Sequence, residues 1–441
     1  MKFFIKTLGC KVNQIESAKI YEDLIRLGNL PSSETNAELF VLNTCVVTKN
    51  AQKECHKIIK RWIKRNPKLI IITGCYPQSV KEELKAFLES LEFKKFLVLG
   101  QTEKLNLLEN FILPEDAPIW KLKELERKET FFKVCDFPGH SRAFVKIQDG
   151  CDNFCAYCIV PIARGTPRSL DKKEVISQVL SFVERGYCEV VLTGINLSKW
   201  GKDLSPPLSI SHLLFDLEEV LYKKGINTII RLSSLEPDQL DEHFFEFVKH
   251  SKLLAPHFHI PLQSGSNRIL KLMRRRYTRE EYLEVVQRLY ELKPYATLGA
   301  DVIVGFPGEG EEEFRETYDL VKRSPLNWLH VFTYSPRPRT LALHLKDASS
   351  SKEVKQRVNE LKSLVSRKRK NFLKTLLNKE FRGIVEKIKP QIRCLTENYV
   401  TLFVEGKEKL SSRDLVLVRP VYFKDDKVFA ELVKVLKKTR L

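Results

Sequence analysis

The sequence contains no apolar run as long as the roughly 20 residues that a bilayer-crossing helix needs, although 43% of its 441 residues are hydrophobic. At its start, Lys6 interrupts the apolar residues 3–5 before the core of a signal peptide could form. No internal repeat is present. We therefore expect a soluble globular chain of about three domains, located in the cytoplasm.

Acidic residues are in deficit. The chain has 56 Asp and Glu against 75 Lys and Arg, which leaves a formal charge of +19. This sign is expected of a protein that meets a polyanion, with nucleic acid as the first candidate. The alternative, that the basic charge only keeps the protein in solution, remains open at this point.

Cysteine, by contrast, is plentiful. A cytosolic chain keeps its thiols reduced, so ten cysteines favour metal binding over disulfides. The ten are Cys10, Cys45, Cys55, Cys75, Cys135, Cys151, Cys155, Cys158, Cys188 and Cys394.

The first 113 residues alternate short apolar runs with amphipathic stretches, which predicts a parallel sheet covered by helices. Three of these runs end in a small residue followed by Cys10, Cys45 or Cys75. Ligands of open α/β sheets bind beyond the carboxyl ends of the strands, so we expect these three thiols to converge.

The rest of the chain divides into three further segments. Residues 114–136 are interpreted as a linker. Residues 137–370 carry six βα units, which predict a full or partial (β/α) barrel. Residues 371–441 change to short strands and predict a small β-barrel, which either binds nucleic acid or acts as a structural cap. The six expected barrel strands are 143–147, 188–193, 228–232, 256–260, 298–304 and 328–334.

Three cysteines, Cys151, Cys155 and Cys158, follow the first expected barrel strand in a CxxxCxxC pattern. Full cysteine ligation of a 4Fe–4S cluster needs four thiolates, so three leave one iron open to a small molecule. Such a cluster can reduce a bound sulfonium such as S-adenosylmethionine to a carbon radical. The alternatives are a structural zinc site, for which no fourth ligand lies nearby, and three buried thiols.

Around these cysteines the chain resembles the radical S-adenosylmethionine methylthiotransferases, and the resemblance runs through almost the whole chain. The matching segments are 146–165, 192–196, 231–234, 259–266 with 273–275, and 301–309. The resemblance implies an N-terminal methylthiotransferase domain (1–113), a radical barrel and a C-terminal TRAM-like β-barrel that helps to hold RNA. It also implies two [4Fe–4S] clusters and S-adenosylmethionine as cofactors.

The resemblance assigns roles to particular residues. It places the second, auxiliary cluster on Cys10, Cys45 and Cys75, and it implies no catalytic side chain beyond the clusters. The residues that it implies for the S-adenosylmethionine site are Gly194, Asn196, Ser233, Gln263, Val304 and Gly305. Cys55, Cys135, Cys188 and Cys394 match no ligand position and are interpreted as packing or unused thiols.

Within the family, the first motif favours one subgroup. Lys11 and Val12 after Cys10 look like the branch that adds a methylthio group at C2 of N6-threonylcarbamoyladenosine, next to the tRNA anticodon. The isopentenyladenosine branch usually has Gln-Met-Asn there, and a third branch modifies a ribosomal-protein aspartate. A non-catalytic iron–sulfur RNA-binding protein is the remaining alternative. Two residues depart from the family pattern, Arg339 at a usual glycine and Pro77 at a usual small residue.

The partners implied are tRNA, an electron donor such as flavodoxin or ferredoxin, and a sulfur source; we expect a monomer without membrane contact. The basic segments 274–276 and 367–370, with Lys and Arg of the last domain, are candidates for one track along an RNA backbone.

Overall fold

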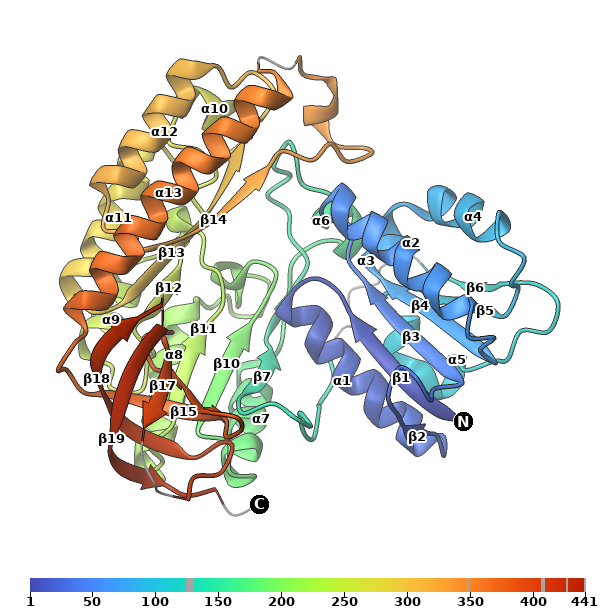
Figure 1. Cartoon of the computed structure of the whole chain (residues 1–441), viewed down its shortest axis with the longest axis horizontal. Helices are drawn as coiled ribbons and strands as arrows, with labels where there is room; N and C mark the ends of the chain where they lie inside the picture. Colours follow the sequence, from blue (N-terminus) through green and yellow to red (C-terminus); the bar gives the residue numbers. More distant parts are fainter. Residues whose placement is uncertain (124–130, 347–348, 406–408, 426, 440–441) are drawn as a thin grey trace. The chain divides into compact units, whose positions relative to one another are not determined.

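The computed structural model describes residues 1–123, 131–346, 349–405, 409–425 and 427–439. These fall into two compact units (Figure 1). The first consists of residues 1–136, 149–168 and 335–344, and the second of residues 137–148, 169–334 and 345–441. The expected order of a parallel α/β sheet, a partial (β/α) barrel and a small β-barrel is confirmed.

The first unit is built on a six-stranded parallel sheet with the order β2-β1-β3-β4-β5-β6. Its strands are β1 (Lys2–Thr7), β2 (Leu30–Pro31), β3 (Leu39–Thr44), β4 (Leu69–Gly74), β5 (Phe96–Leu99) and β6 (Ile119–Lys121). Its helices are α1 (Lys11–Arg26), α2 (Lys49–Ile63), α3 (Cys75–Ser79), α4 (Lys81–Glu89), α5 (Leu107–Asn110) and α6 (Val160–Arg164).

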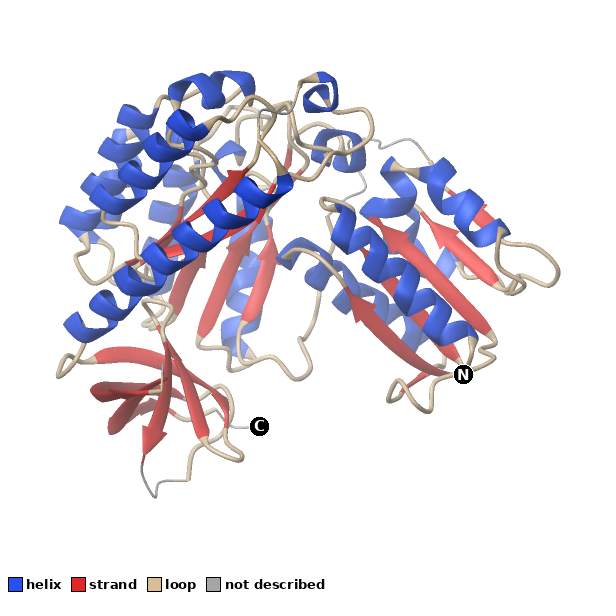
Figure 2. Cartoon of the chain, turned by 45° about the horizontal axis from the view of Figure 1, so that its top comes forward, coloured by secondary structure: helices blue, strands red, loops and turns tan. Residues whose placement is uncertain are grey.

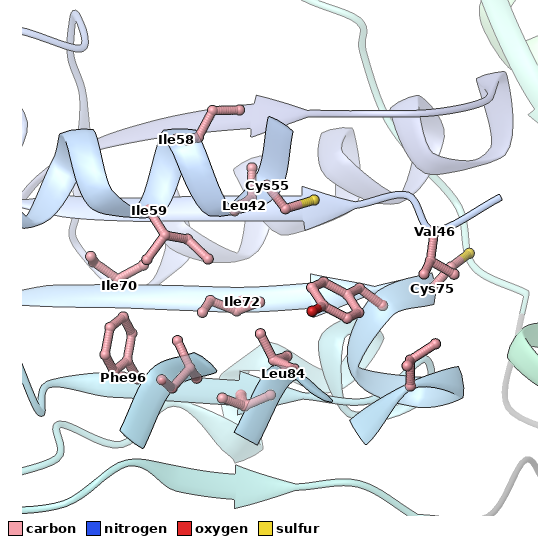
Figure 3. Packing of buried hydrophobic residues seen from close by; sticks show 14 of the residues in the cluster. Leu42, Val46, Cys55, Ile58, Ile59, Ile70, Ile72, Cys75, Leu84 and Phe96 are labelled. Carbon is pink, nitrogen blue, oxygen red and sulfur yellow. The ribbon is translucent and has the colours of Figure 1, made fainter. Parts of the chain in front are cut away.

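Both faces of this sheet are apolar, because helices cover each of them. Alternate residues of β3 and β4 point to opposite sides. Leu39 and Leu69 pack in one cluster with residues of α1 and α5. Leu42 and Ile72 pack in the other with residues of α2, α3 and α4, part of which is drawn in Figure 3.

The segment interpreted as a linker, 114–136, contributes one strand. Strand β6 pairs in parallel with β5 and forms the edge of the first sheet. This strand continues the sheet beyond residue 113, the limit expected from the sequence. It was not predicted, because three residues are too few to show a strand pattern. Residues 124–130 of this segment lie outside the described residues.

The second unit begins with two three-stranded parallel sheets, β11-β10-β7 and β12-β13-β14. All six strands expected from the sequence are present. They are β7 (Ala143–Lys146), β10 (Glu189–Thr193), β11 (Ile229–Leu232), β12 (His257–His259), β13 (Thr297–Val304) and β14 (Trp328–Thr333). Two short strands, β8 (Gln148–Asp149) and β9 (Arg168–Ser169), flank the loop that carries Cys151.

Helices, which are blue in Figure 2, follow the barrel strands along the chain. They are α7 (Lys172–Glu184), α8 (Ile210–Lys223), α9 (Glu242–His250), α10 (Asn267–Leu272), α11 (Arg279–Leu292), α12 (Glu311–Arg323) and α13 (Ser351–Thr375). Single 3₁₀ turns occur at Glu103–Asn106, Leu197–Lys199, Pro237–Gln239 and Leu341–His344. Ser350 caps α13 through a reciprocal bond pattern with Glu353, which fixes where this long helix begins. None of the described helices combines the length and the apolar character that a bilayer crossing requires.

The last strands close into a five-stranded barrel with the order β15-β16-β17-β19-β18. They are β15 (Phe381–Lys387), β16 (Ile392–Thr396), β17 (Thr401–Glu405), β18 (Leu415–Lys424) and β19 (Lys427–Lys437). Its interior is apolar and includes Val385, Leu402 and Val416. Closure leaves no free sheet edge, which lets so small a domain keep its own core.

Candidate functional site

Three cysteines stand at the carboxyl ends of three neighbouring strands of the first sheet. Cys10 follows β1 and precedes α1, Cys45 follows β3, and Cys75 follows β4 as the first residue of α3. Gly9 and Gly74 make the two turns with positive φ angles, +96° and +97°. A Cβ on Gly74 would lie 2.4 Å from the Thr44 carbonyl oxygen, so this turn accepts only glycine.

The structure brings these three thiols together, as the strand ends predicted. The site of a Cβ on Gly9 is only 3.1 Å from the Cys45 sulfur. The thiol of Cys45 also interacts electrostatically with those of Cys10 and Cys75, and Cys10 interacts with Cys75. The convergence follows from the β1-β3-β4 order, which places the three strand ends side by side.

The spacing of the thiols discriminates between kinds of metal. A single zinc ion lies about 2.3 Å from each thiolate, which brings its ligand sulfurs within about 4.6 Å of one another. Among the described residues, neither Cys10, Cys45 and Cys75 nor Cys151, Cys155 and Cys158 form a set with all ligand atoms within 4.8 Å. As the side chains stand in the structure, neither set therefore has the spacing of a single-zinc site.

Burial acts on these thiols. It is the largest of the causes that raise the pKa of Cys45 to about 12, and the neighbouring Cys75 and Cys10 contribute to the same rise. The pKa of Cys10 is raised as well, although this residue faces solvent, because protein atoms crowd around its sulfur. Without a cation, the two thiols stay protonated at neutral pH. Metal binding must displace their protons, and it is favoured as pH rises.

Amide side chains hold the turns and one of the sulfurs. Asn13 donates from Nδ2 to the carbonyl oxygens of Leu8 at 2.8 Å and Thr44 at 2.9 Å, which fixes the backbone before Cys10 and Cys45. Gln101 donates from Nε2 to the Cys75 sulfur at 3.6 Å. An N–H group aimed at a ligand sulfur stabilises negative charge on a metal cluster.

A buried network of charges lies beside this site. The carboxylate of Glu16 accepts from Lys104 at 2.5 Å and from Arg164 at 3.0 and 3.2 Å. Arg164 also donates to Asp149 at 3.1 Å and to Asn13 Oδ1 at 2.6 Å. All of these side chains are at most 4% exposed. The network joins α1 to α6, the helix that follows Cys151, Cys155 and Cys158 in the chain. Its members lie far apart in the sequence, so local patterns did not predict it.

The loop with Cys151, Cys155 and Cys158 belongs to the same compact unit as the first sheet. Gly150 has φ +74°, and a Cβ there would lie 2.1 Å from the Thr166 carbonyl oxygen. The Cys151 amide donates to Gly165 at 2.9 Å, which closes the loop at its base. The three thiols are half-buried, so a cluster and a small molecule can both reach them.

Several residues implied for the S-adenosylmethionine site lie at carboxyl strand ends of the second unit. The amide of Gly194, after β10, donates to Ser233 Oγ at 3.3 Å, and the amide of Asn196 donates to Gln148 Oε1 at 2.8 Å. Both polar atoms of the Asn196 side chain are buried and lack a protein partner within the described residues. Such orphaned atoms are expected where a ligand supplies the missing bonds.

The remaining implied residues lie at the end of β13 or in a segment that is hydrogen-bonded to it. Gln263 has φ +66° and bonds through its backbone to Asp301 and Ile303 of β13. Gly305 has φ +73° and donates to Glu309 Oε1 at 2.8 Å. Val304 as a whole residue is 1% exposed, and its carbonyl oxygen accepts from the Tyr334 amide at 2.9 Å.

A chain of hydrogen bonds crosses the three strands of the β12-β13-β14 sheet. Trp328 Nε1 donates to His330 Nε2 at 2.9 Å, so the proton of neutral His330 sits on Nδ1, which donates to Asp301 at 3.1 Å. His259 Nε2 lies 3.0 Å from the other Asp301 oxygen. Burial raises the pKa of Asp301, but these imidazole bonds outweigh it and hold the pKa well below its usual range. Because Nδ1 of His330 carries a proton, this grouping does not suit a metal ion.

The other cysteines are placed as packing or isolated thiols. Cys55 on α2 is fully buried and donates to the Cys45 carbonyl oxygen at 3.8 Å; Figure 3 shows it beside Leu42. Cys188 and Cys394 are buried in apolar clusters, and Cys135 is exposed.

Two features of the predicted RNA track are wrong. Arg275 is 4% exposed and forms a buried ion pair with Glu236, so it is not available to a backbone phosphate. Lys368 donates to the carbonyl oxygens of Lys322 and Ser324 at 3.1 and 2.6 Å. The sequence shows the charges of these segments but not the partners that the fold gives them.

Arg339, at a usual glycine, adopts φ +62°, the conformation that glycine would favour.

Comparison with known proteins now identifies the family. Residues 145–321 match the radical SAM superfamily, and residues 2–93 match the uncharacterized protein family UPF0004. The chain is 39% identical to the threonylcarbamoyladenosine tRNA methylthiotransferase MtaB of Aquifex aeolicus, over 95% of this chain and all of that protein. The chain belongs to the radical S-adenosylmethionine methylthiotransferase family.

Other relatives and structures agree with this. A tRNA-2-methylthio-N(6)-dimethylallyladenosine synthase of Clostridium botulinum is 34% identical, over 88% of this chain and 85% of that protein. The fold is similar to that of TsrM from Kitasatospora setae, a radical S-adenosylmethionine methyltransferase, with a TM-score of 0.56 over 76% of each chain at 14% identity. As a member of this family, the chain is a radical enzyme that uses S-adenosylmethionine and [4Fe–4S] clusters.

Proposed function

We propose that this enzyme adds a methylthio group to C2 of N6-threonylcarbamoyladenosine next to the anticodon of tRNA. The observation that carries the proposal is the presence of two separate sets of three free thiols in one compact unit. One set suffices to start a radical reaction. A second set gives the enzyme a place from which sulfur can be supplied.

The proposal assigns a cluster to each set. Cys151, Cys155 and Cys158 would hold the cluster that binds S-adenosylmethionine, and Cys10, Cys45 and Cys75 would hold the auxiliary cluster. When bound, these cofactors supply the radical chemistry and the sulfur, which no side-chain base could provide for an aromatic C–H bond.

The protein's own residues would position these groups. Gln101 aims an N–H group at the Cys75 sulfur and so adjusts the electrostatics of the auxiliary site. We propose Gly194, Asn196, Ser233, Gln263, Val304 and Gly305 as contacts to S-adenosylmethionine. The orphaned side-chain atoms of Asn196 support this for one member of the set.

The substrate subgroup is supported by two observations. Lys11 and Val12 follow Cys10 as in the threonylcarbamoyladenosine branch, and the 39% identical relative carries that activity in its name. The dimethylallyladenosine relative at 34% identity makes the isopentenyladenosine branch the second candidate. The remaining partners, a flavodoxin or ferredoxin electron donor and a sulfur source, as well as a monomeric state and a cytoplasmic location, are part of the same proposal.

Mass analysis of tRNA nucleosides tests the substrate. Cells that lack the gene should lose 2-methylthio-N6-threonylcarbamoyladenosine and regain it from a plasmid copy. Loss of the isopentenyl analogue instead would move the enzyme to the other tRNA branch. An unchanged nucleoside profile would leave the ribosomal-protein and non-catalytic alternatives.

Iron content tests the two ligand sets separately. The triple Ala variants of Cys10, Cys45 and Cys75, and of Cys151, Cys155 and Cys158, should each retain about four of eight irons. Only the second should lose formation of 5′-deoxyadenosine from S-adenosylmethionine altogether. Cys135→Ala, which removes an exposed thiol, is the matched control and should keep full iron.

A further inference from the structure

A pocket of about 500 Å³ lies at the amino ends of the barrel strands, where α13 meets the C-terminal β-barrel. Arg142 just precedes β7, and Trp328 is the first residue of β14. Arg369 of α13 and Arg393 of β16 complete the charged lining, together with Glu386. The residues proposed for S-adenosylmethionine follow the opposite, carboxyl ends of these strands, so this pocket is a separate site.

Positive charge in and around the pocket exceeds negative charge. Arg142 and Arg393 share one carboxylate, Glu386, at 3.4 and 3.6 Å. The next carboxylate, Glu189, is 3.6 Å from Arg142 but is bound in bidentate fashion by Arg231 at 2.6 and 3.0 Å. Four guanidinium groups, that of Arg369 included, thus face two carboxylates.

Arg369 is the centre of this excess. No carboxylate of the described residues lies within ion-pair distance of it; its polar contact is the Thr297 hydroxyl at 3.3 Å. The guanidinium carbon lies 4.8 Å from the Trp328 ring centre and 5.3 Å from that of Phe372. A half-buried cation without an anionic partner is costly, and burial accordingly lowers the pKa of Arg369 to about 10.

Two further donors of the pocket lack acceptors. Arg142 Nη1 and Arg393 Nε are buried and form no hydrogen bond within the described residues. Guanidinium groups in this state are suited to an oxyanion, which accepts several charge-assisted hydrogen bonds at once.

The aromatic residues of the pocket narrow the ligand class. Trp328 is covered by Arg369, and the ring of Tyr399 stacks on His257 at 4.2 Å and lies 5.1 Å from the Arg231 guanidinium. These rings are engaged with protein groups, so the pocket offers charge and hydrogen bonds rather than a stacking face for a base. A phosphate group fits these requirements without any sequence preference.

We infer that this pocket binds a phosphate group, with Arg369, Arg142 and Arg393 as its donors. The phosphate can come from an RNA backbone or from a free small anion. Its assignment to tRNA rests on the proposed function, whereas the binding of phosphate itself does not.

The test compares Arg369→Gln with Lys362→Gln, an exposed lysine on the same helix and outside the basic segment 367–370, in the cluster-loaded enzyme. The first measurement is the Tm in sodium phosphate and in sodium chloride of equal ionic strength. Phosphate should raise the Tm of the wild type and of Lys362→Gln but not that of Arg369→Gln. Arg393→Gln, at a residue 42% exposed, serves if Arg369→Gln does not fold.

The second measurement is tRNA affinity as a function of salt. If the phosphate belongs to tRNA, Arg369→Gln should bind about tenfold more weakly, and its log–log salt slope should be shallower by about 0.7 to 0.9 than that of Lys362→Gln. A phosphate effect on Tm without this change would assign the pocket to a free anion. If neither measurement separates the two variants, the inference is overturned. None of these outcomes depends on which nucleoside the enzyme modifies, so failure of the proposed function is seen separately.

Discussion

Removing the charge of Glu16 should destabilise the first unit strongly. In Glu16→Gln, Arg164 retains Asp149 at 3.1 Å, but Lys104 retains only the uncharged Gln101 Oε1. Breaking a buried ion pair from one side costs about 3 to 5 kcal/mol. Lys104 without its partner can also lose its proton. For a lysine with the ordinary pKa of 10.5, deprotonation at pH 7 costs about 5 kcal/mol, which sets the same upper limit.

Native-state hydrogen exchange of the β3 and β4 amides is the suitable assay, because a chain of two units has no single free energy of unfolding. The double variant Glu16→Gln with Lys104→Met removes both charges and should recover at least half of the loss. The control is Glu219→Gln, which removes a 61% exposed partner of Lys223 and should cost less than about 0.5 kcal/mol. A loss below about 1 kcal/mol in Glu16→Gln would refute the reasoning.

Three further outcomes are expected. Burial raises the pKa of Glu309 to about 7 from an ordinary value of 4.5, so the folded state holds the extra proton between these values. The stability of the second unit, measured by native-state hydrogen exchange of the β13 amides, should therefore fall by up to about 3 kcal/mol as pH rises from 4.5 to 7, and Glu309→Gln should lack this slope. Gly74→Ala should lose the iron of one cluster, because its Cβ would meet the Thr44 backbone; Gly28→Ala, with φ +76° but open space, should keep full iron by colorimetric assay. Cys55→Ala should keep all iron and cost about 1 to 2 kcal/mol in native-state hydrogen exchange of the β3 amides, and iron loss there would make Cys55 a ligand.

Much of the fold could be predicted because its signals are local. The six barrel strands follow apolar periodicity within single segments, and the structure has them where the pattern placed them. Strand β6 was not predicted, because it is only three residues long and lies in the segment interpreted as a linker.

The sequence by itself determined the three-thiol loop, since Cys151, Cys155 and Cys158 lie within eight residues. It also predicted that Cys10, Cys45 and Cys75 meet, because each follows a strand and parallel strands end at one edge. Only the tertiary structure decided what surrounds them. Glu16, Lys104 and Arg164 come from segments up to 148 residues apart, and a buried charge shows its partner only after the chain has folded. The same holds for Arg369, because the absence of a counter-charge beside it among the described residues is a property of its surroundings in space rather than of its neighbours in sequence.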